Sequence, residues 1–247
     1  MMAVYILWLR QLKRYLRSRS RIVGSVGQPL LFLVALGFGF GPVYRRAGGG
    51  NYIQFLAPGI IAMAILFAAM FSGVEMLWDK QFGFLKETLV APVSRLRIML
   101  GRTLGGATVA TLQGVIVLLI ALLAGFRPTL VTLPVALVFG ILTGLLFTAL
   151  GTAIASVLED MQGFQLIMSF LVMPLFFLSG ALFPLTGVPR AIELLARVNP
   201  LAYGIDGLRW ALIGQAHFSL ALDFAVLGAV TALLLILGAW LFTRVEV

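Results

Sequence analysis

The stretch LVTLPVALVFGILTGLLFTALGTAIASV, residues 130–157, decides the fold class of this 247-residue chain. It carries no charged side chain and is longer than the roughly 20 apolar residues that cross a bilayer as a helix. Inside hydrocarbon a single segment satisfies all of its backbone polar groups only as a helix. The sequence therefore predicts a membrane-spanning helix here, with Pro134 as a candidate for its true start.

Apolar runs of similar length recur along the whole chain. Hydrophobic residues make up 61% of the sequence and charged residues only 11%, where a soluble domain has about 25% charged residues. This composition excludes soluble globular and disordered classes, and the lack of cysteine excludes a disulfide scaffold. We predict an all-α integral membrane protein, a single domain over 1–247, whose five further spans lie near 22–42, 53–77, 103–125, 163–183 and 221–243.

Basic residues set the expected orientation. The chain has 18 Lys and Arg against 9 Asp and Glu, and Lys and Arg are enriched in segments 1–21 and 78–102. The positive-inside rule then places both termini in the cytosol, in a cytoplasmic (inner) membrane. No nucleic-acid-binding motif accompanies the charge, so we expect these side chains to contact anionic lipid headgroups rather than nucleic acid.

The N-terminal segment 1–21 has an amphipathic pattern. Apolar Tyr5, Trp8, Leu12 and Tyr15 fall at helical spacing. The rest of the wheel is largely basic, with Arg10, Lys13, Arg14, Arg17 and Arg21. This pattern predicts a helix lying in the membrane interface. The alternative, a cleaved signal peptide, is disfavoured by the long basic region and the lack of a small-residue cleavage site.

Enzyme chemistry has little support. The chain has one histidine, His217, and no cysteine, H-E-x-x-H motif or P-loop. We therefore expect no catalytic residue, no metal site and no cofactor in this chain, so that any ATP-driven process needs an ATPase on another chain. The spans carry almost no ionisable groups, which disfavours ion-coupled transport. For Gln28 and Gln113 we favour interhelical hydrogen bonds over substrate contact.

The predicted cytosolic loop 78–102 contains a short apolar face. Phe82, Leu85 and Leu89 share one side of a short helix that Pro92 ends, while Glu87 points elsewhere and Arg95 belongs to the next helix. Two interpretations stand equally: a helix that docks on a partner, or one that rests on lipid.

The predicted external segment 184–220 begins at Pro184 and contains a second short helix. Asn199–Pro200 is a start signal. Leu201, Ile205, Leu208 and Leu212 follow at helical spacing, with Tyr203 and Trp210, and Asp206 and Arg209 form an i, i+3 pair on the polar side. We expect this helix to dip into the outer leaflet.

The fifth predicted span is rich in phenylalanine and methionine, including Phe170, Met173, Phe176 and Phe177. Such residues make adaptable apolar surfaces. They are candidates for lining a substrate path, but packing against lipid explains them more simply.

Four segments together resemble the permease subunit of ABC-2 type transporters, most closely the daunorubicin-resistance or multidrug exporter branch. They are FGFLKETLVAPVSR (82–95), LGRTLGG (100–106), PLFFLSGALFP (174–184) and NPLAYGIDGLR (199–209). The resemblance covers almost the whole chain and implies six spans after an interfacial helix. It also implies a pair of permeases, either two copies or a copy and a paralogue, with two ATPase subunits that bind ATP and Mg²⁺.

The resemblance also gives roles to the two loops. The segment around 82–95 would be a coupling helix in which Phe82, Leu85 and Leu89 bury in the ATPase while Glu87 and Arg95 pair at the rim. Short re-entrant helices within 184–220 would close the pathway outside. The implied function is export of an amphipathic drug-like or lipid-like substrate. Alternatives are export of a polysaccharide or lipid-linked precursor, and a non-transporting membrane anchor.

Overall fold

The computed structural model describes residues 2–84 and 93–243, and every regular element within these ranges is helical. The elements are α1 (Met2–Arg17), α2 (Arg19–Arg46), α3 (Tyr52–Gln81), α5 (Arg95–Leu123), α6 (Leu133–Val157), α7 (Met161–Ile167), the π-helical turn η1 (Met168–Val172), α8 (Met173–Phe177), α9 (Arg190–Val198), α10 (Pro200–Ile213) and α11 (Leu220–Thr243).

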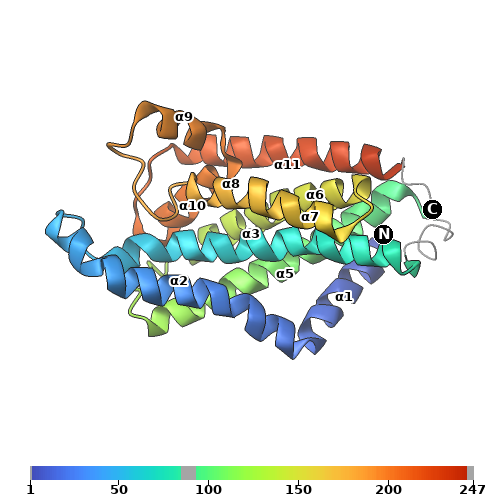
Figure 1. Ribbon diagram of the computed structural model, residues 1–247, viewed down its shortest axis with the longest axis horizontal. Coiled ribbons are helices and arrows are strands. Elements are labelled where there is room, and N and C mark those ends of the chain that lie inside the picture. Colours follow the sequence, from blue (N-terminus) through green and yellow to red (C-terminus); the bar gives the residue numbers. More distant parts are fainter. Residues whose placement is uncertain (1, 85–92, 244–247) are drawn as a thin grey trace.

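Helix α3 is the centre of the bundle, with α2, α5, α6 and α10 packed around it and α11 packed on α6 (Figure 1). Its most apolar stretch is 83% buried, whereas those of α2 and α11 are only 17% buried. A helix that is apolar on all sides is stable in a core or in lipid. The core therefore lies around α3, and α2 and α11 offer most of their surface to the membrane.

The bundle has two distinct ends. Helix α1 begins and α11 ends at one of them (Figure 1), where Lys80 Nζ donates to the Leu158 carbonyl at 3.2 Å. At the opposite end the Tyr52 hydroxyl donates to the Leu182 carbonyl at 2.7 Å, and α9 lies beyond it. We call these the α1 end and the α9 end.

Five helices of the described chain are long and apolar enough to cross a membrane, where six were predicted. The predicted span 163–183 is a 17-residue helix, 161–177, interrupted by η1. At 1.5 Å per residue it is about 26 Å long, short of the roughly 30 Å hydrocarbon core. Pro174 has no N–H for the helix ladder, and the chain turns away at Gly180, where φ is 76°. The six-span count is thus not confirmed.

The predicted N-terminal helix is confirmed as α1, which ends at Arg17 instead of continuing to residue 21. It packs against α5 (Figure 1) because Gly101 and Gly105 leave room for it. A Cβ placed on Gly101 would lie 2.9 Å from Leu7 Cβ, and one on Gly105 would lie 2.8 Å from Gln11 Cβ. Paired small residues of this kind let two helices approach closely.

The starts of two predicted helices are confirmed. Helix α6 begins at Leu133 with Pro134 in its first turn, and α10 begins at Pro200, where the Asn199 side chain accepts the Leu201 N–H at 3.0 Å. The resemblance implied more than one short helix within 184–220, but the sequence analysis did not locate helix α9. It is a short amphipathic helix enclosed between Pro189 and Pro200, with Leu194, Leu195 and Val198 exposed.

Candidate functional site

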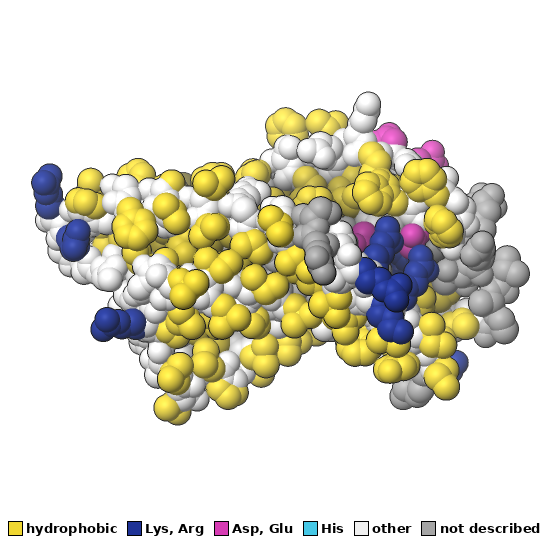
Figure 2. All heavy atoms as spheres, turned by 90° about the horizontal axis from the view of Figure 1, so that it is seen from below, with side chains coloured by type: hydrophobic (Ala, Val, Ile, Leu, Met, Phe, Trp, Pro, Cys, Tyr) yellow, Lys and Arg dark blue, Asp and Glu magenta, His cyan; other side chains and the backbone are white. Residues whose placement is uncertain are grey.

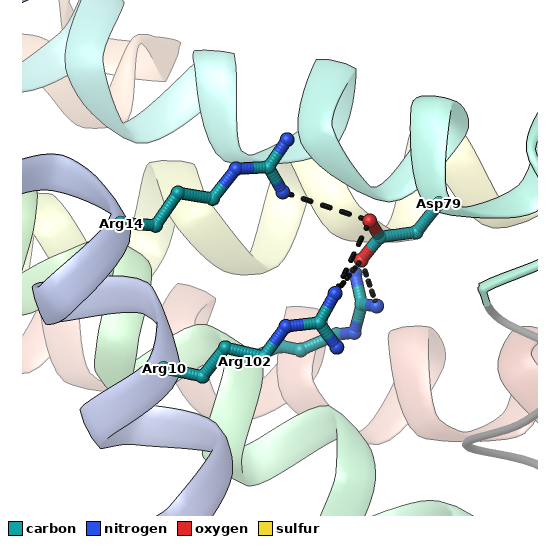
Figure 3. Close-up of polar contacts among 4 residues, drawn as sticks. All are labelled: Arg10, Arg14, Asp79 and Arg102. Carbon is teal, nitrogen blue, oxygen red and sulfur yellow. Dashed lines mark hydrogen bonds and ion pairs between the residues drawn. The ribbon is translucent and has the colours of Figure 1, made fainter. Parts of the chain in front are cut away.

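Asp79, in the last turn of α3, joins three helices at the α1 end. Its Oδ2 lies 2.5 Å from Arg102 Nη2 on α5. Two arginines of α1 approach the same carboxylate, Arg10 at 3.4 Å and Arg14 at 3.6 Å. All three guanidinium groups point toward Asp79, two of them from α1 and one from α5 (Figure 3). A single carboxylate therefore holds the end of α3 against both α1 and α5.

The three contacts differ in strength because they differ in burial. Asp79 and Arg102 expose only 5% and 3% of their side chains, and each would be a costly uncompensated charge without the other. Arg10 and Arg14 expose 42% and 38%, so water screens their attraction to Asp79. Arg102 is therefore the main ion-pair partner of Asp79. Arg10 and Arg14 are bound more weakly, and their positive charge remains partly exposed to solvent.

The predicted coupling residues stand next to this cluster in the chain. Phe82 caps the end of α3 and is 71% exposed, and Arg95 is the first residue of α5. The other predicted coupling residues, Leu85, Glu87, Leu89 and Pro92, lie outside the described residues, as does the proposed pairing of Glu87 with Arg95.

A basic groove of about 1200 Å³ runs between α1 and the end of α3. Figure 2 shows Lys and Arg side chains gathered in one patch at this end, with acidic atoms beside them. The patch belongs to α1, whose Arg10, Lys13, Arg14 and Arg17 line the groove. The α3 side contributes Asp79 and aromatic Trp78 and Phe82, followed by Phe84.

An inner recess of about 570 Å³ lies deeper, between α2, α3 and α5. Ser18 and Trp78 line both the groove and the inner recess, so the two adjoin. The Tyr15 hydroxyl donates to Gln113 Oε1 at 2.5 Å, which confirms the interhelical hydrogen bond expected of this glutamine. Gln113 Nε2 is buried and has no acceptor within the described ranges. The recess also receives Gln28, Glu75, Phe67 and Phe71.

The predicted path residues of the broken helix do not share one environment. Phe170 is 79% exposed, and Met173 and Phe177 are partly exposed. Phe176 is fully buried and packs edge-on against Phe32 of α2, with ring centroids 6.4 Å apart. None of the four lines the groove or the inner recess. The geometry favours packing over a shared lining role.

The predicted gate residues gather at the α9 end around a buried α10. Asp206 accepts the backbone N–H groups of His217 at 2.7 Å and Phe218 at 2.8 Å. Arg209 donates to the Gly180 carbonyl at 2.8 Å and lies 4.1 Å from the Phe55 ring centroid. The expected polar side of α10 is therefore buried, and Asp206 and Arg209 bind separate backbone groups instead of each other.

Further hydrogen bonds fix α10 to its surroundings. Asn199 Nδ2 donates to the Leu175 carbonyl and the Tyr203 hydroxyl donates to the Arg197 carbonyl, both at 2.6 Å. Pro200 opens α10, and Pro184 lies in the non-helical connection before α9. Burial lowers the pKa of Arg209 to about 10, so its guanidinium remains protonated at neutral pH. Helix α10 is thus fixed at the α9 end by hydrogen bonds between its side chains and backbone groups.

Sequence reasoning missed the Asp79–Arg102 pair. Both residues fall within the predicted loop 78–102, whereas the structure places them in α3 and α5, and a buried charge in an apolar chain demands a partner. The need for a partner was the only indication of the pair that the sequence offered, because each residue is a charge next to an apolar run. Within the described ranges, no group of three or more His, Cys, Asp or Glu side chains is placed to hold a metal ion.

Comparison with known proteins gives a consistent result. The family model for ABC-2 type transporters matches residues 2–213. Nodulation protein J of Rhizobium leguminosarum bv. viciae is 30% identical over 84% of this chain and 81% of its own length. The putative transport permease ycf38 of Porphyra purpurea is 30% identical over 78% and 68%, and that of Cyanophora paradoxa is 28% identical over 84% and 73%. With its multi-pass helical structure, the chain therefore belongs to the ABC-2 type transporter family.

Proposed function

We propose that this chain is the membrane subunit of an ATP-driven exporter in the cytoplasmic membrane, with its α1 end in the cytosol. Two copies of a separate ATPase subunit bind ATP and Mg²⁺, and the permease works with a second copy or a paralogue. The cargo is an amphipathic drug-like or lipid-like molecule. Family membership supports the division between permease and ATPase, since ABC-2 permeases in general work with ATPase subunits.

The observation that carries the proposal is the link between Phe82 and Asp79. Phe82 is an exposed aromatic residue at the start of the predicted coupling loop, and Asp79 lies one turn earlier, bonded to α5 and α1. A force applied by an ATPase at this loop reaches two other helices through one carboxylate. Coupling requires contacts that differ between nucleotide states, and this arrangement supplies a rigid connection for them.

The broken helix 161–177 serves as a sixth, short crossing in this proposal. It begins next to Leu158, whose carbonyl binds Lys80 at the α1 end, and it leads to Leu182, which binds Tyr52 at the α9 end. These contacts lie at the two extremes of α3. Helices α9 and α10 then form the outer closure, and local membrane thinning accommodates the short crossing.

One observation favours the second candidate, export of a polysaccharide or lipid-linked precursor. The basic groove offers four cationic side chains, which suit an anionic headgroup better than a cationic drug. The three relatives compared above also carry nodulation or transport-permease names and none is named for drug export.

The test is affinity purification of the tagged chain from native membranes in mild detergent, followed by an ATPase assay. We expect a P-loop subunit to co-purify with vanadate-sensitive hydrolysis. Phe82→Ala should weaken this association, whereas Phe40→Ala, which removes a comparably exposed ring on α2, should not. A chain that purifies alone and inactive, under conditions that preserve other complexes, contradicts the proposal.

A further inference from the structure

We infer that the basic groove and the inner recess form one binding site for a phosphate-bearing amphiphile drawn from the membrane leaflet at the α1 end. The inference rests on the proposed function and specifies the cargo class that the permease takes up. The phosphate occupies the groove, and the uncharged part of the molecule passes Ser18 and Trp78 into the inner recess.

The positive charge of the groove favours binding of an anion. Four cationic side chains line it against one carboxylate, Asp79, and that carboxylate already binds buried Arg102 at 2.5 Å. Lys13 and Arg17 are exposed and have no ion-pair partner within the described part of the chain. Guanidinium groups present paired N–H donors that match phosphate oxygens. Their concentration on one face of α1 therefore favours a phosphate ester over a neutral or cationic ligand.

The size and apolar lining of the inner recess favour a ligand that is larger than a free ion. Its walls are mostly apolar, with Phe67, Phe71 and Ala68 among them, and it holds about 570 Å³. Ligand sites of several hundred Å³ with a few polar groups are typical of organic molecules. Inorganic phosphate would fill a small part of the groove and cover none of this apolar wall.

One polar group in the recess orients the molecule. Gln113 Nε2 is a buried donor without an acceptor in the described chain, and an unmade hydrogen bond of this kind is costly. An ester or glycosidic oxygen next to the phosphate satisfies it. The phosphate itself stays in the groove, where the cationic side chains of α1 lie.

The experiment places the purified full-length chain in phosphatidylcholine nanodiscs and measures its tryptophan fluorescence. Phosphatidic acid with brominated acyl chains is the titrant, because bromine quenches tryptophan at short range and Trp78 lines both parts of the site. We expect saturable quenching that is largely lost in Trp78→Phe.

Charge variants then separate specific binding from ordinary lipid contact. The double variant Lys13→Gln/Arg17→Gln leaves the Asp79 contacts intact and should raise the half-saturating concentration about tenfold, the loss of roughly 1.4 kcal/mol. The control Arg45→Gln/Arg46→Gln removes the same charge from exposed residues at the far end of α2, and it should leave saturation unchanged.

Three outcomes overturn the inference. Brominated phosphatidylcholine quenches as strongly and saturably as phosphatidic acid, or inorganic phosphate displaces the lipid at equal concentration, or the groove variant binds the lipid as tightly as the control variant. Binding is measured without the ATPase, so the two proposals fail separately. Saturable binding with no co-purifying ATPase removes the proposed function, and a coupled ATPase with no saturable binding removes only this site.

Discussion

At the scale of single residues, one buried ion pair dominates the α1 end. Asp79 and Arg102 are both almost completely buried, and two more guanidinium groups, of Arg10 and Arg14, surround the carboxylate (Figure 3). Burying charges is expensive unless each is paired with good geometry. The intact pair therefore contributes little net stability, but removal of one partner would leave the other as an unpaired buried charge, which is strongly destabilising.

Asp79→Asn should destabilise the protein by about 3 kcal/mol, because Arg102 is left as an uncompensated buried charge. The free energy of unfolding can be measured by titrating sodium dodecyl sulfate into mixed micelles. The matched control is Glu193→Gln, which breaks the exposed Arg197–Glu193 pair on α9 and should cost about 0.5 kcal/mol or less. Equal losses in the two variants would show that Arg102 does not depend on Asp79.

Asn199→Ala should cost about 1–2 kcal/mol, since it removes the N-cap of α10 together with the bond to the Leu175 carbonyl. Ser94→Ala is the control, because Ser94 occupies the same position before α5 but its side chain makes no capping bond. The same unfolding titration applies to both. A Ser94→Ala loss as large as that of Asn199→Ala would argue against the capping explanation.

At the scale of elements, the contact between α1 and α5 shows how far an interfacial helix is tied to the bundle. Backbone and Cβ atoms of α1 lie directly over Gly101 and Gly105, and the Trp8 indole N–H donates to Thr108 Oγ1 at 3.0 Å. A helix held only by lipid would not need the space that the missing side chains of Gly101 and Gly105 leave on α5. Movement of α5 therefore carries α1 with it.

The double variant L7C/G101C should form a disulfide on mild oxidation, because the two Cβ positions lie 2.9 Å apart and a small shift reaches the usual spacing of about 3.8 Å. The natural chain has no cysteine, so the product is unambiguous by mass spectrometry. L7C/G39C is the control, since a Cβ at Gly39 has no neighbour within 4 Å. Cross-linking at equal rates would mean that α1 is free to leave α5.

Elements governed by local rules were predictable from the sequence. The run 130–157 has no charged residue, and Pro134 and Asn199 mark helix starts through interactions with their own neighbours in the chain. The broken helix ends at Phe177 instead of the predicted residue 183, because hydropathy counts apolar residues and ignores the backbone. Pro174, with its missing N–H, and Gly180, with its positive φ, decide where that helix ends.

Contacts between distant segments were not predictable. Asp206 was expected to pair with Arg209, but α10 is buried, and the nearby N–H groups of His217 and Phe218 bind the carboxylate instead. Arg102 stands 23 residues from Asp79, beyond any helical spacing rule. Such partners are set by packing, which a single sequence does not reveal.

At the scale of the whole molecule, the two ends differ in chemistry. The α1 end carries the basic patch and the predicted coupling loop, and the α9 end carries the short helices α9 and α10 (Figures 1 and 2). A membrane between these ends would separate them into two compartments. The number of crossings therefore determines which residues share a compartment.

Single-cysteine variants test this separation directly. Glu159→Cys at the α1 end and His217→Cys at the α9 end are both exposed positions in a cysteine-free chain. With 161–177 as a sixth crossing, a membrane-impermeant maleimide should label His217→Cys from outside intact cells and Glu159→Cys only after permeabilisation. Labelling of both from one side would mean that the broken helix returns without crossing.

Asp79 takes part in two structures, the basic groove and the ion pair between α3 and α5, and this has a consequence for regulation. It lines the groove and also anchors α3 to α5. Binding of a ligand in the groove and movement of α3 against α5 would therefore both act on the same carboxylate. Coupling between two binding equilibria is reciprocal: if nucleotide binding in the ATPase changes the affinity of the groove by some factor, the occupant of the groove changes nucleotide affinity by that same factor. A filled groove would then report to the ATPase that cargo is present before ATP is committed to hydrolysis.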